Sequence, residues 1–209
     1  MIGLSSLLLR SVSLLLRWQW FTPVHETRNI YEHTLKEIDF NDFMPYISNF
    51  TLHIVSTNRQ ADTLEADGYE FSNYQQRQSR GLDIGAIAFC IFVGQELAHI
   101  GWVALTEEAA PYVDSWRYHV DFTGGEACSG SSSTLPQYEG KGLFKYGYYR
   151  RFEYLREMGV DKMIASVDIN NTASNNMHAK FHPKIRARVR HIKFLGWESW
   201  KEWKLSTQL

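Results

Sequence analysis

The chain has 209 residues, with ordinary shares of hydrophobic and charged residues of 44% and 22%. This length allows one well-packed core and excludes two large domains. The two cysteines, Cys90 and Cys128, lie far apart and outside any C-x-x-C motif, which excludes a disulfide scaffold and a structural zinc site and favours a reducing, intracellular setting.

The net charge of −1 conceals an uneven distribution of charge along the chain. Residues 1–25 carry +2, residues 26–140 carry −11 and residues 141–209 carry +8. Such a split suggests a basic surface for an anionic cofactor beside an acidic surface for a cationic substrate. The alternative is that both surfaces are merely solvated.

The first 25 residues form a separate segment that is basic and largely apolar. A polar stripe at helical spacing crosses it, consisting of Ser6, Arg10, Ser13 and Arg17. The two arginines interrupt the apolar run well short of the roughly 20 residues that a membrane span needs. We therefore predict an amphipathic helix in an extension of residues 1–28, ahead of a domain of residues 29–209. Peripheral membrane contact, a dimer contact, docking on the domain itself and organelle import all remain open for this helix, and the chain is expected to be cytoplasmic.

The start of the domain predicts a strand followed by two helices. We expect a short strand at residues 33–39 and then a helix that is capped by Asn41 or Asp42 and reaches Phe50. A polar region from Thr57 onward begins with a second helix and continues into an exposed loop.

The middle of the chain predicts antiparallel strands. Residues 85–93 and 97–105 are rich in β-forming residues and are separated by Gly94-Gln95-Glu96, which is typical of a hairpin. Residues 112–122 alternate aromatic with polar side chains and predict an extra strand with its aromatic side chains on one face. Asp114, His119 and Asp121 are candidates for chemistry there, and the alternative is that this stretch only contributes to the core.

The last third of the chain alternates strands and helices. We expect a strand at residues 129–135, a helix from Leu143 to a C-terminal stop at Gly159, and a buried strand at residues 162–168. A short helix follows Asn170-Asn171 and ends at Pro183, and two strands, residues 184–195 and 197–205, close the chain around Gly196. The fold class is therefore α/β with an antiparallel front half.

The most informative stretch lies between the first of these strands and its helix. Pro136 ends the strand, and Gly140 and Gly142 then lead directly into the helix. The glycines permit a tight turn and a close approach of a ligand, and the start of a helix presents free N–H groups. A phosphate group is the expected ligand. A Walker loop is excluded because Lys141 is followed by glycine, and a dinucleotide fingerprint is excluded because Lys145 stands where it needs glycine.

The order of these elements resembles the GNAT acyltransferase superfamily. The pyrophosphate-binding motif of that family is matched by Gln137-x-x-Gly140-x-Gly142 between strand and helix, and Asn171-x-x-Ser174 follows at the right distance. The resemblance covers roughly residues 33–205. It implies a mixed, mostly antiparallel sheet flanked by helices, with two parallel strands that splay apart at the cofactor site.

The resemblance also implies acetyl-coenzyme A as co-substrate. The residues implied to contact it are Ser133, Thr134, Leu135, Gln137, Tyr138, Gly140, Lys141, Gly142, Leu143, Asn171 and Ser174. Main-chain N–H groups would hold the pyrophosphate, and the splayed strand would polarise the thioester carbonyl. No metal ion is expected, because the histidine pair His178 and His182 lacks a third ligand.

The catalytic groups are less well defined by the sequence. His178 stands where many GNAT enzymes carry a tyrosine that protonates the leaving thiolate, and an imidazolium could take that role; the alternative is a structural histidine. Glu126 is the first candidate for the general base and Asp121 the second, and either could be a plain surface acid.

The predicted function is an N-acetyltransferase that moves an acetyl group from acetyl-coenzyme A to a primary amine of a small molecule or peptide by direct attack. Two alternatives are a long-chain N-acyltransferase that uses acyl-coenzyme A or acyl carrier protein, and a noncatalytic module of the same fold that binds an acyl-coenzyme A. Nucleic-acid binding is not expected, because Arg186, Arg188 and Arg190 accompany no binding motif.

Overall fold

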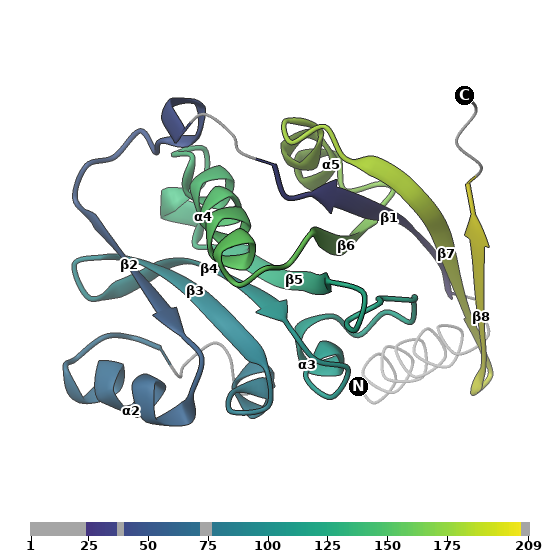
Figure 1. The fold of residues 1–209 in the computed structure, drawn as a ribbon, viewed down its shortest axis with the longest axis horizontal. Helices are drawn as coiled ribbons and strands as arrows, with labels where there is room; N and C mark the ends of the chain where they lie inside the picture. Colours follow the sequence, from purple (N-terminus) through teal and green to yellow (C-terminus); the bar gives the residue numbers. More distant parts are fainter. Residues whose placement is uncertain (1–23, 37–39, 72–76, 206–209) are drawn as a thin grey trace, which may run out of the picture.

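The protein forms one mixed sheet of eight strands in the order β2-β3-β4-β5-β6-β1-β7-β8 (Figure 1). The computed structural model describes residues 24–36, 40–71 and 77–205, and the helix predicted near the N-terminus lies outside them. The strands are β1 (Val24–Thr34), β2 (Phe50–Val55), β3 (Ala86–Val93), β4 (Glu96–Ala104), β5 (Glu126–Thr134), β6 (Lys162–Asp168), β7 (Lys184–Phe194) and β8 (Trp197–Lys204). Neighbouring strands are antiparallel except for β5 and β6, which confirms the predicted mixed sheet.

Helices cover both faces of the sheet. Figure 1 shows α4 (Leu143–Glu157) and α5 (Thr172–Ala179) on one face, and α2 (Asn58–Ala66) and α3 (Ala110–Val113) on the other. Short 3-10 turns connect these elements, namely η2 (Phe40–Phe43), η4 (Gln78–Gly81) and η5 (Pro136–Tyr138). Within the described residues, no helix has both the length and the apolar character needed to cross a membrane.

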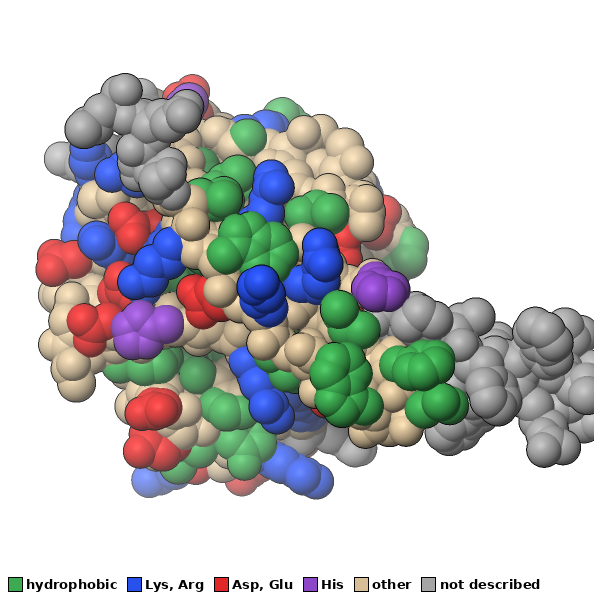
Figure 2. Space-filling model, turned by 90° about the vertical axis from the view of Figure 1, so that its right-hand side faces the viewer, with side chains coloured by type: hydrophobic (Ala, Val, Ile, Leu, Met, Phe, Trp, Pro, Cys, Tyr) green, Lys and Arg blue, Asp and Glu red, His purple; other side chains and the backbone are tan. Residues whose placement is uncertain are grey.

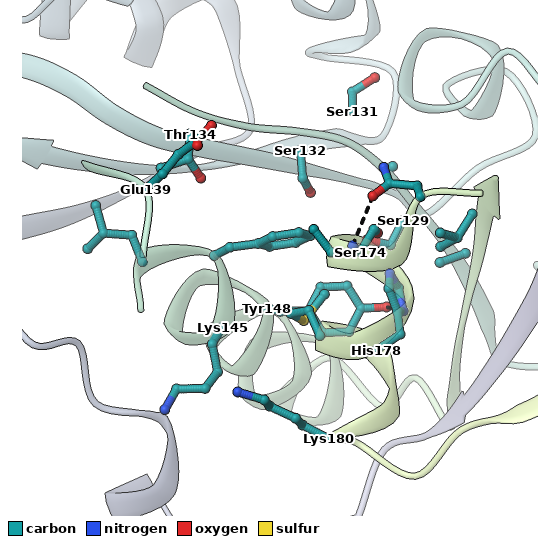
Figure 3. A pocket seen from close by; sticks show the side chains of 18 of the residues that line it. Ser129, Ser131, Ser132, Thr134, Glu139, Lys145, Tyr148, Ser174, His178 and Lys180 are labelled. Atoms are coloured by element: carbon teal, nitrogen blue, oxygen red, sulfur yellow. Dashed lines mark hydrogen bonds between the residues drawn. The ribbon is translucent and has the colours of Figure 1, made fainter. Parts of the chain in front are cut away.

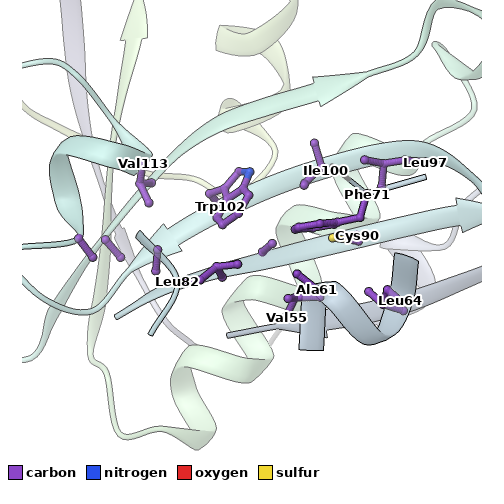
Figure 4. Close-up of a cluster of buried hydrophobic side chains, with 14 of the residues drawn as sticks. Val55, Ala61, Leu64, Phe71, Leu82, Cys90, Leu97, Ile100, Trp102 and Val113 are labelled. Atoms are coloured by element: carbon purple, nitrogen blue, oxygen red, sulfur yellow. The ribbon is translucent and has the colours of Figure 1, made fainter. Parts of the chain in front are cut away.

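The hydrophobic core lies on both faces because β3 and β4 are apolar at almost every position. In β3, Ala88 and Cys90 face the cluster under α2 that also contains Trp102 and Phe71 (Figure 4), whereas Phe89 faces α4. Side chains of a strand alternate between its two faces, so a strand covered on both sides reads as a continuous apolar run. The hairpin predicted from that run is confirmed.

The parallel strands β5 and β6 separate after a short ladder. They pair from Glu126 opposite Lys162 to Ser129 opposite Ala165, and both continue beyond this point without pairing to each other. The register of β5 against β4 shifts in the same region, and Ser131 has a φ of 44°. A bulge of this kind bends the strand that carries it. The predicted splay is therefore present in the structure.

Three predictions for the front of the chain are wrong in detail. The first strand is β1, which begins at Val24 and ends at Thr34, whereas the strand was expected at residues 33–39. The helix expected to reach Phe50 is only the turn η2, and Phe50–Val55 forms the strand β2, which pairs with β3. Residues 112–122 pair with no strand, although Trp116, Tyr118 and Val120 do pack together against the core as expected.

Candidate functional site

A cavity of about 810 Å³ lies at the point where β5 and β6 separate. We distinguish two sides of it. The helical side consists of the turn from Tyr138 to Leu143, the starts of α4 and α5, and the β5 residues from Ser129 to Thr134. The Arg28 side consists of Arg28 and Ser166, which line the cavity, and of Asp114 directly behind Ser166.

The helical side offers an uncapped helix start. Gly142 is the N-cap of α4 with a φ of 82°, and none of the described side chains caps this end. Gly140, two residues earlier, also has a positive φ of 71°. Lys145 and Lys180 are also among the lining residues (Figure 3), and the Lys145 ammonium donates one hydrogen bond to the Asp42 carbonyl (2.6 Å). Free N–H groups, the positive end of the helix dipole and two ammonium groups together favour an anion here.

The β5 wall of the cavity is polar rather than apolar. Ser129, Ser131, Ser132 and Thr134 line this wall, and in Figure 3 Ser132 points toward the helices whereas Ser131 points away from them, where its hydroxyl donates to the Val113 carbonyl (2.6 Å). Beyond Ser129, the main-chain groups that would pair with β6 have no ladder partner there, because β6 has diverged. Such groups can hydrogen-bond a ligand that enters between the strands.

A buried arginine lies under this wall. The Arg151 side chain has no exposed surface, donates from Nη1 to the Ser129 hydroxyl (3.0 Å), and lies 4.8 Å from the centre of the Tyr148 ring. Burial lowers the pKa of Arg151 to about 10, and burial raises the pKa of Tyr148, which lines the cavity. Arg151 therefore remains charged at neutral pH and Tyr148 keeps its proton.

His178 also lines the cavity, and it is neutral. Burial lowers its pKa to about 3, and the nearby Arg151 charge adds to this effect. Its Nδ1 lies 2.9 Å from His33 Nε2 and 3.3 Å from the Tyr148 hydroxyl. The imidazolium expected from the sequence is thus absent from the protein on its own at neutral pH.

The contacts of His33 determine which nitrogen of His178 carries the proton. His33 Nδ1 is buried without a hydrogen-bond partner, so placing the His33 proton there would leave a buried donor unpaired. With its proton on Nε2, His33 donates to His178 Nδ1. His178 then carries its own proton on Nε2, which is the ring donor left for a ligand.

The Arg28 side lies on the opposite face of the sheet from α4. Along β6, Met163 packs in the cluster with α4 and Ile164 packs near Trp116, so Ser166 shares the face of Ile164. The Ser166 hydroxyl donates to Asp114 Oδ2 (2.5 Å), and Arg28 Nη1 donates to the same hydroxyl (3.2 Å). The cavity thus gives access to both faces of the sheet through the splay.

Asp114 is held by several donors. Its carboxylate also accepts the Tyr118 hydroxyl (2.9 Å) and the Trp116 N–H (3.0 Å), and its side chain is 7% exposed. Burial raises the pKa of Asp114, while these hydrogen bonds and the Arg28 charge act in the opposite direction. A carboxylate with a raised pKa behind a cavity wall is typical of a proton acceptor.

No family model matches the chain, and no curated protein matches it. Its fold is similar to solved structures. A GCN5-related N-acetyltransferase from Sphaerobacter thermophilus is 14% identical with a TM-score of 0.51, covering 89% of this chain and 56% of that one. A GNAT-family acetyltransferase from Colwellia psychrerythraea is 15% identical with a TM-score of 0.52, covering 88% of this chain and 61% of that one. A tandem GNAT protein from the clavulanic acid biosynthesis pathway is 12% identical with a TM-score of 0.50, covering 93% of this chain and 57% of that one.

The chain has the same fold as these GNAT structures. It spans little more than half the length of these structures, and identities this low concern the fold alone. The splay of β5 from β6 and the turn before α4 are the two parts of the GNAT fold that the sequence motif anticipated.

Most residues predicted for the cofactor line the cavity. These are Thr134, Tyr138, Gly140, Gly142, Leu143, Asn171 and Ser174, and Asn171 also caps α5 by accepting the Ser174 N–H (3.0 Å; dashed in Figure 3). Four others do not line it, namely Ser133, Leu135, Gln137 and Lys141. The reason is visible for Gln137, whose side chain donates to Glu96 (2.8 Å), and for Leu135, whose N–H donates to Ala98.

The two acids chosen from the sequence as general base lie away from the cavity. Glu126 stands at the start of β5, where its carboxylate accepts two short hydrogen bonds from Arg186 (2.7 and 2.8 Å) and one from the Asp121 N–H. Asp121 accepts the Thr123 hydroxyl and the Gly124 N–H in an exposed turn. Both carboxylates serve local structure, and Asp114 is the acid that the fold brings to the site.

Three cavity residues and the buried Arg151 beneath them have no functional role in the sequence predictions. Tyr148 and Arg151 lie in a predicted helix and Ser166 in a predicted strand, whereas Arg28 falls in the predicted N-terminal extension. The one available signal was the i, i+3 spacing of Tyr148 and Arg151 on the otherwise apolar face of α4, which places a charge in the core. Nothing local in the sequence links Arg28 with Ser166.

The arginines of β7 have structural partners. Arg186 pairs with Glu126, Arg188 donates to Asn29 (3.1 Å), and Arg190 lies over the Trp203 ring. Figure 2 shows basic side chains interspersed with large hydrophobic ones on this face of the molecule. Among the described residues, no three His, Cys, Asp or Glu side chains gather as a metal site requires.

Proposed function

We propose that the protein is an N-acetyltransferase that transfers an acetyl group from acetyl-coenzyme A to a primary amine by direct attack. The observation that carries this proposal is the cavity through the splay, with an anion site at its helical side and a serine-linked carboxylate at its Arg28 side. A donor and an acceptor could meet in it from opposite faces of the sheet, and such positioning can supply several kcal/mol of the barrier reduction, about 7 to 11 in well-oriented model systems.

The residues of the helical side fit coenzyme A. The N–H groups at the start of α4 would hold its pyrophosphate, and a side chain at Gly142 would come within 3.3 Å of Pro45, so the turn is built for bare backbone. Lys145 and Lys180 would add positive charge, and Asn171 also lines the cavity. When bound, acetyl-coenzyme A supplies an activated acyl group as a thioester.

Ser166 and Asp114 are the proposed proton acceptors. The Ser166 oxygen has two lone pairs, one of which accepts from Arg28, while its hydrogen is donated to Asp114. One lone pair remains for the N–H of an amine. As the amine gives up a proton to Ser166, the proton of Ser166 passes to Asp114, whose raised pKa suits this task.

Tyr148 is the proposed proton donor on the helical side. It keeps its proton at neutral pH, and the Arg151 charge beneath its ring lowers the energy of the phenolate left after donation. His178, neutral and oriented by His33, offers a second hydrogen bond through Nε2–H. These two groups replace the single imidazolium that the sequence predicted.

The two alternatives are less well supported. A long acyl chain needs an apolar tunnel, whereas the cavity wall along β5 carries hydroxyl groups at Ser129, Ser131, Ser132 and Thr134. A noncatalytic module would need no buried carboxylate next to the cavity, and Asp114 argues against it.

The proposal is tested by calorimetric titration of the full chain with acetyl-coenzyme A, followed by assays of thiol release with a panel of primary amines. We expect saturable binding and amine-dependent release of coenzyme A. Binding without turnover on any amine would identify a noncatalytic module, and an absence of binding would overturn the proposal entirely. Faster turnover with a long-chain donor than with acetyl-coenzyme A would favour the long-chain alternative.

A further inference from the structure

The Arg28 side of the cavity contains a guanidinium with unused hydrogen-bonding capacity. Arg28 lines the cavity, stacks 4.4 Å from the centre of the Trp116 ring, and has a side chain that is 29% exposed. Nη1 donates to Ser166, and Nε is buried without a partner. A guanidinium has five N–H donors in a rigid fork that matches a carboxylate.

Asp114 does not satisfy this guanidinium. Its nearest approach is 4.0 Å, from Oδ1 to Nη1, and its oxygens already accept hydrogen bonds from Ser166, Tyr118 and the Trp116 N–H. Because Nε is buried, a ligand in the cavity reaches this guanidinium through its Nη groups, and a charged donor group that faces a cavity favours an anionic ligand group. The Arg28 side therefore favours a ligand with a negative charge next to Arg28.

The distance between Arg28 and Ser166 limits which anion fits. Nη1 lies 3.2 Å from the Ser166 oxygen that would receive the amine proton. The amine and the anionic group must therefore be neighbours in the ligand, as they are when both are attached to one carbon. Asp168, opposite Arg28 in the pairing of β1 with β6, lines the same cavity, so a single negative charge is better tolerated than a phosphate dianion.

We propose that the Arg28 side binds a free α-amino acid, with its carboxylate on the Arg28 guanidinium and its amino group on Ser166. This inference rests on the proposed acetyl transfer and assigns the class of its acceptor. A peptide N-terminus has no such carboxylate next to its amine, and a simple alkylamine has none at all. Both are predicted to be poor acceptors.

The test compares matched acceptors that differ in the carboxylate alone. With acetyl-coenzyme A saturating, the acceptor KM is measured for a series of L-amino acids and for the corresponding amino acid amides. Loss of a hydrogen-bonded charge pair predicts a KM for each amide that is roughly 10- to 100-fold higher than for its acid. Arg28→Gln is expected to remove this preference by raising the KM for the acids alone, with the KM for acetyl-coenzyme A unchanged.

Arg188→Gln is the matched control. Arg188 is exposed on β7 and, like Arg28, donates a hydrogen bond to a neighbouring side chain, in this case to Asn29 Oδ1, but it does not line the cavity. It should retain the preference for acids. Equal use of acids and amides by the wild-type protein, or an Arg28→Gln effect of the same size on both, would overturn the assignment.

Binding separates this inference from the proposed function. Saturation-transfer NMR with alanine in the presence of coenzyme A is expected to show binding that Arg28→Gln abolishes. Such binding without acetyl transfer to any amine would refute the transfer and leave the amino acid site supported. Transfer to alkylamines without binding of alanine would refute the amino acid site and leave the transfer supported.

Discussion

The two sides of the cavity are built in different ways. On the helical side, contiguous residues from Tyr138 to Leu143 form a turn whose main chain faces the cavity. On the Arg28 side, three side chains from β1, β6 and the segment after α3 converge, with Ser166 hydrogen-bonded to both of the others. A site made of main-chain groups needs only glycine and a helix start, whereas a site made of side chains requires the whole sheet to be in register.

This difference implies different sensitivities to mutation. The turn from Tyr138 to Leu143 should keep its affinity for the anion through most side-chain changes and lose it when its backbone is altered. The Arg28 side should lose its proposed activity when a single polar group of its side chains is removed, even though the backbone is unchanged.

The largest effect is expected from the proton acceptors. Ser166→Ala and Asp114→Asn should each lower kcat by about 100- to 10,000-fold, which is the usual contribution of general base catalysis. The affinity for acetyl-coenzyme A, measured by calorimetry, should not change. Ser132→Ala, which removes another cavity hydroxyl, serves as the control and should keep most of the wild-type kcat. An unaltered kcat in Ser166→Ala would exclude the proposed proton path.

The next effect concerns the backbone of the helical side. Gly142→Ala places a Cβ on a residue with a φ of 82° and should weaken acetyl-coenzyme A binding by roughly 10- to 100-fold, because the strain reshapes the turn. Gly159→Ala carries the same strain at a φ of 78° beyond the other end of α4, with no atom within 4 Å of its Cβ. Gly159→Ala should lower the free energy of unfolding and leave the affinity for acetyl-coenzyme A unchanged. Equal affinities for the two variants would place the anion site elsewhere.

A smaller effect is expected from the buried histidines. Burial lowers the pKa values of His33, His99 and His178, so the folded protein keeps them neutral where the unfolded chain binds protons. Stability is then complete above about pH 6.5 and falls as the pH decreases, by up to about 1.4 kcal/mol per pH unit for each histidine. In urea unfolding between pH 6.5 and 5, His178→Gln should make this decline shallower by up to that amount. An unchanged slope in His178→Gln would contradict the burial of a neutral His178.

The smallest effect is expected from a change to Trp116, whose ring packs against the Arg28 guanidinium. Trp116→Leu removes the ring beneath the guanidinium and should raise the acceptor KM about 2- to 5-fold, in line with a half-exposed cation–π contact. The KM for acetyl-coenzyme A should stay the same. A kcat loss as large as that of Ser166→Ala would show that Trp116 holds the proton path and not only Arg28.

The difference between a site made of one contiguous turn and a site made of distant side chains also explains which parts of the structure the sequence predicted. The strand, the turn at Gly140 and Gly142 and the helix up to Gly159 are local patterns, and they predicted the helical side and the sheet around it. The pairing of β2 was missed because the capping residues before Pro45 favoured a helix, while the alternation of Phe50–Val55 was satisfied only by the distant β3. Long-range pairing decided this element against local propensity.

Asp114 is a candidate from the sequence, but its association with Arg28 and Ser166 could not be predicted, because Arg28 and Asp114 lie 138 and 52 residues from Ser166 in the chain. Glu126 was selected for its place before the splayed strand, yet Arg186 on β7 neutralises it. The charge of His178 was likewise decided by burial next to Arg151, which no spacing in the sequence indicates.

The most direct measurement is mass spectrometry of the products formed from isotopically labelled acetyl-coenzyme A and a mixture of free amino acids and alkylamines. The account predicts labelled N-acetylamino acids as the main products with the wild-type protein, and almost none with Ser166→Ala at unchanged cofactor binding. Label retained entirely in acetyl-coenzyme A, in the presence of demonstrated binding, would contradict it.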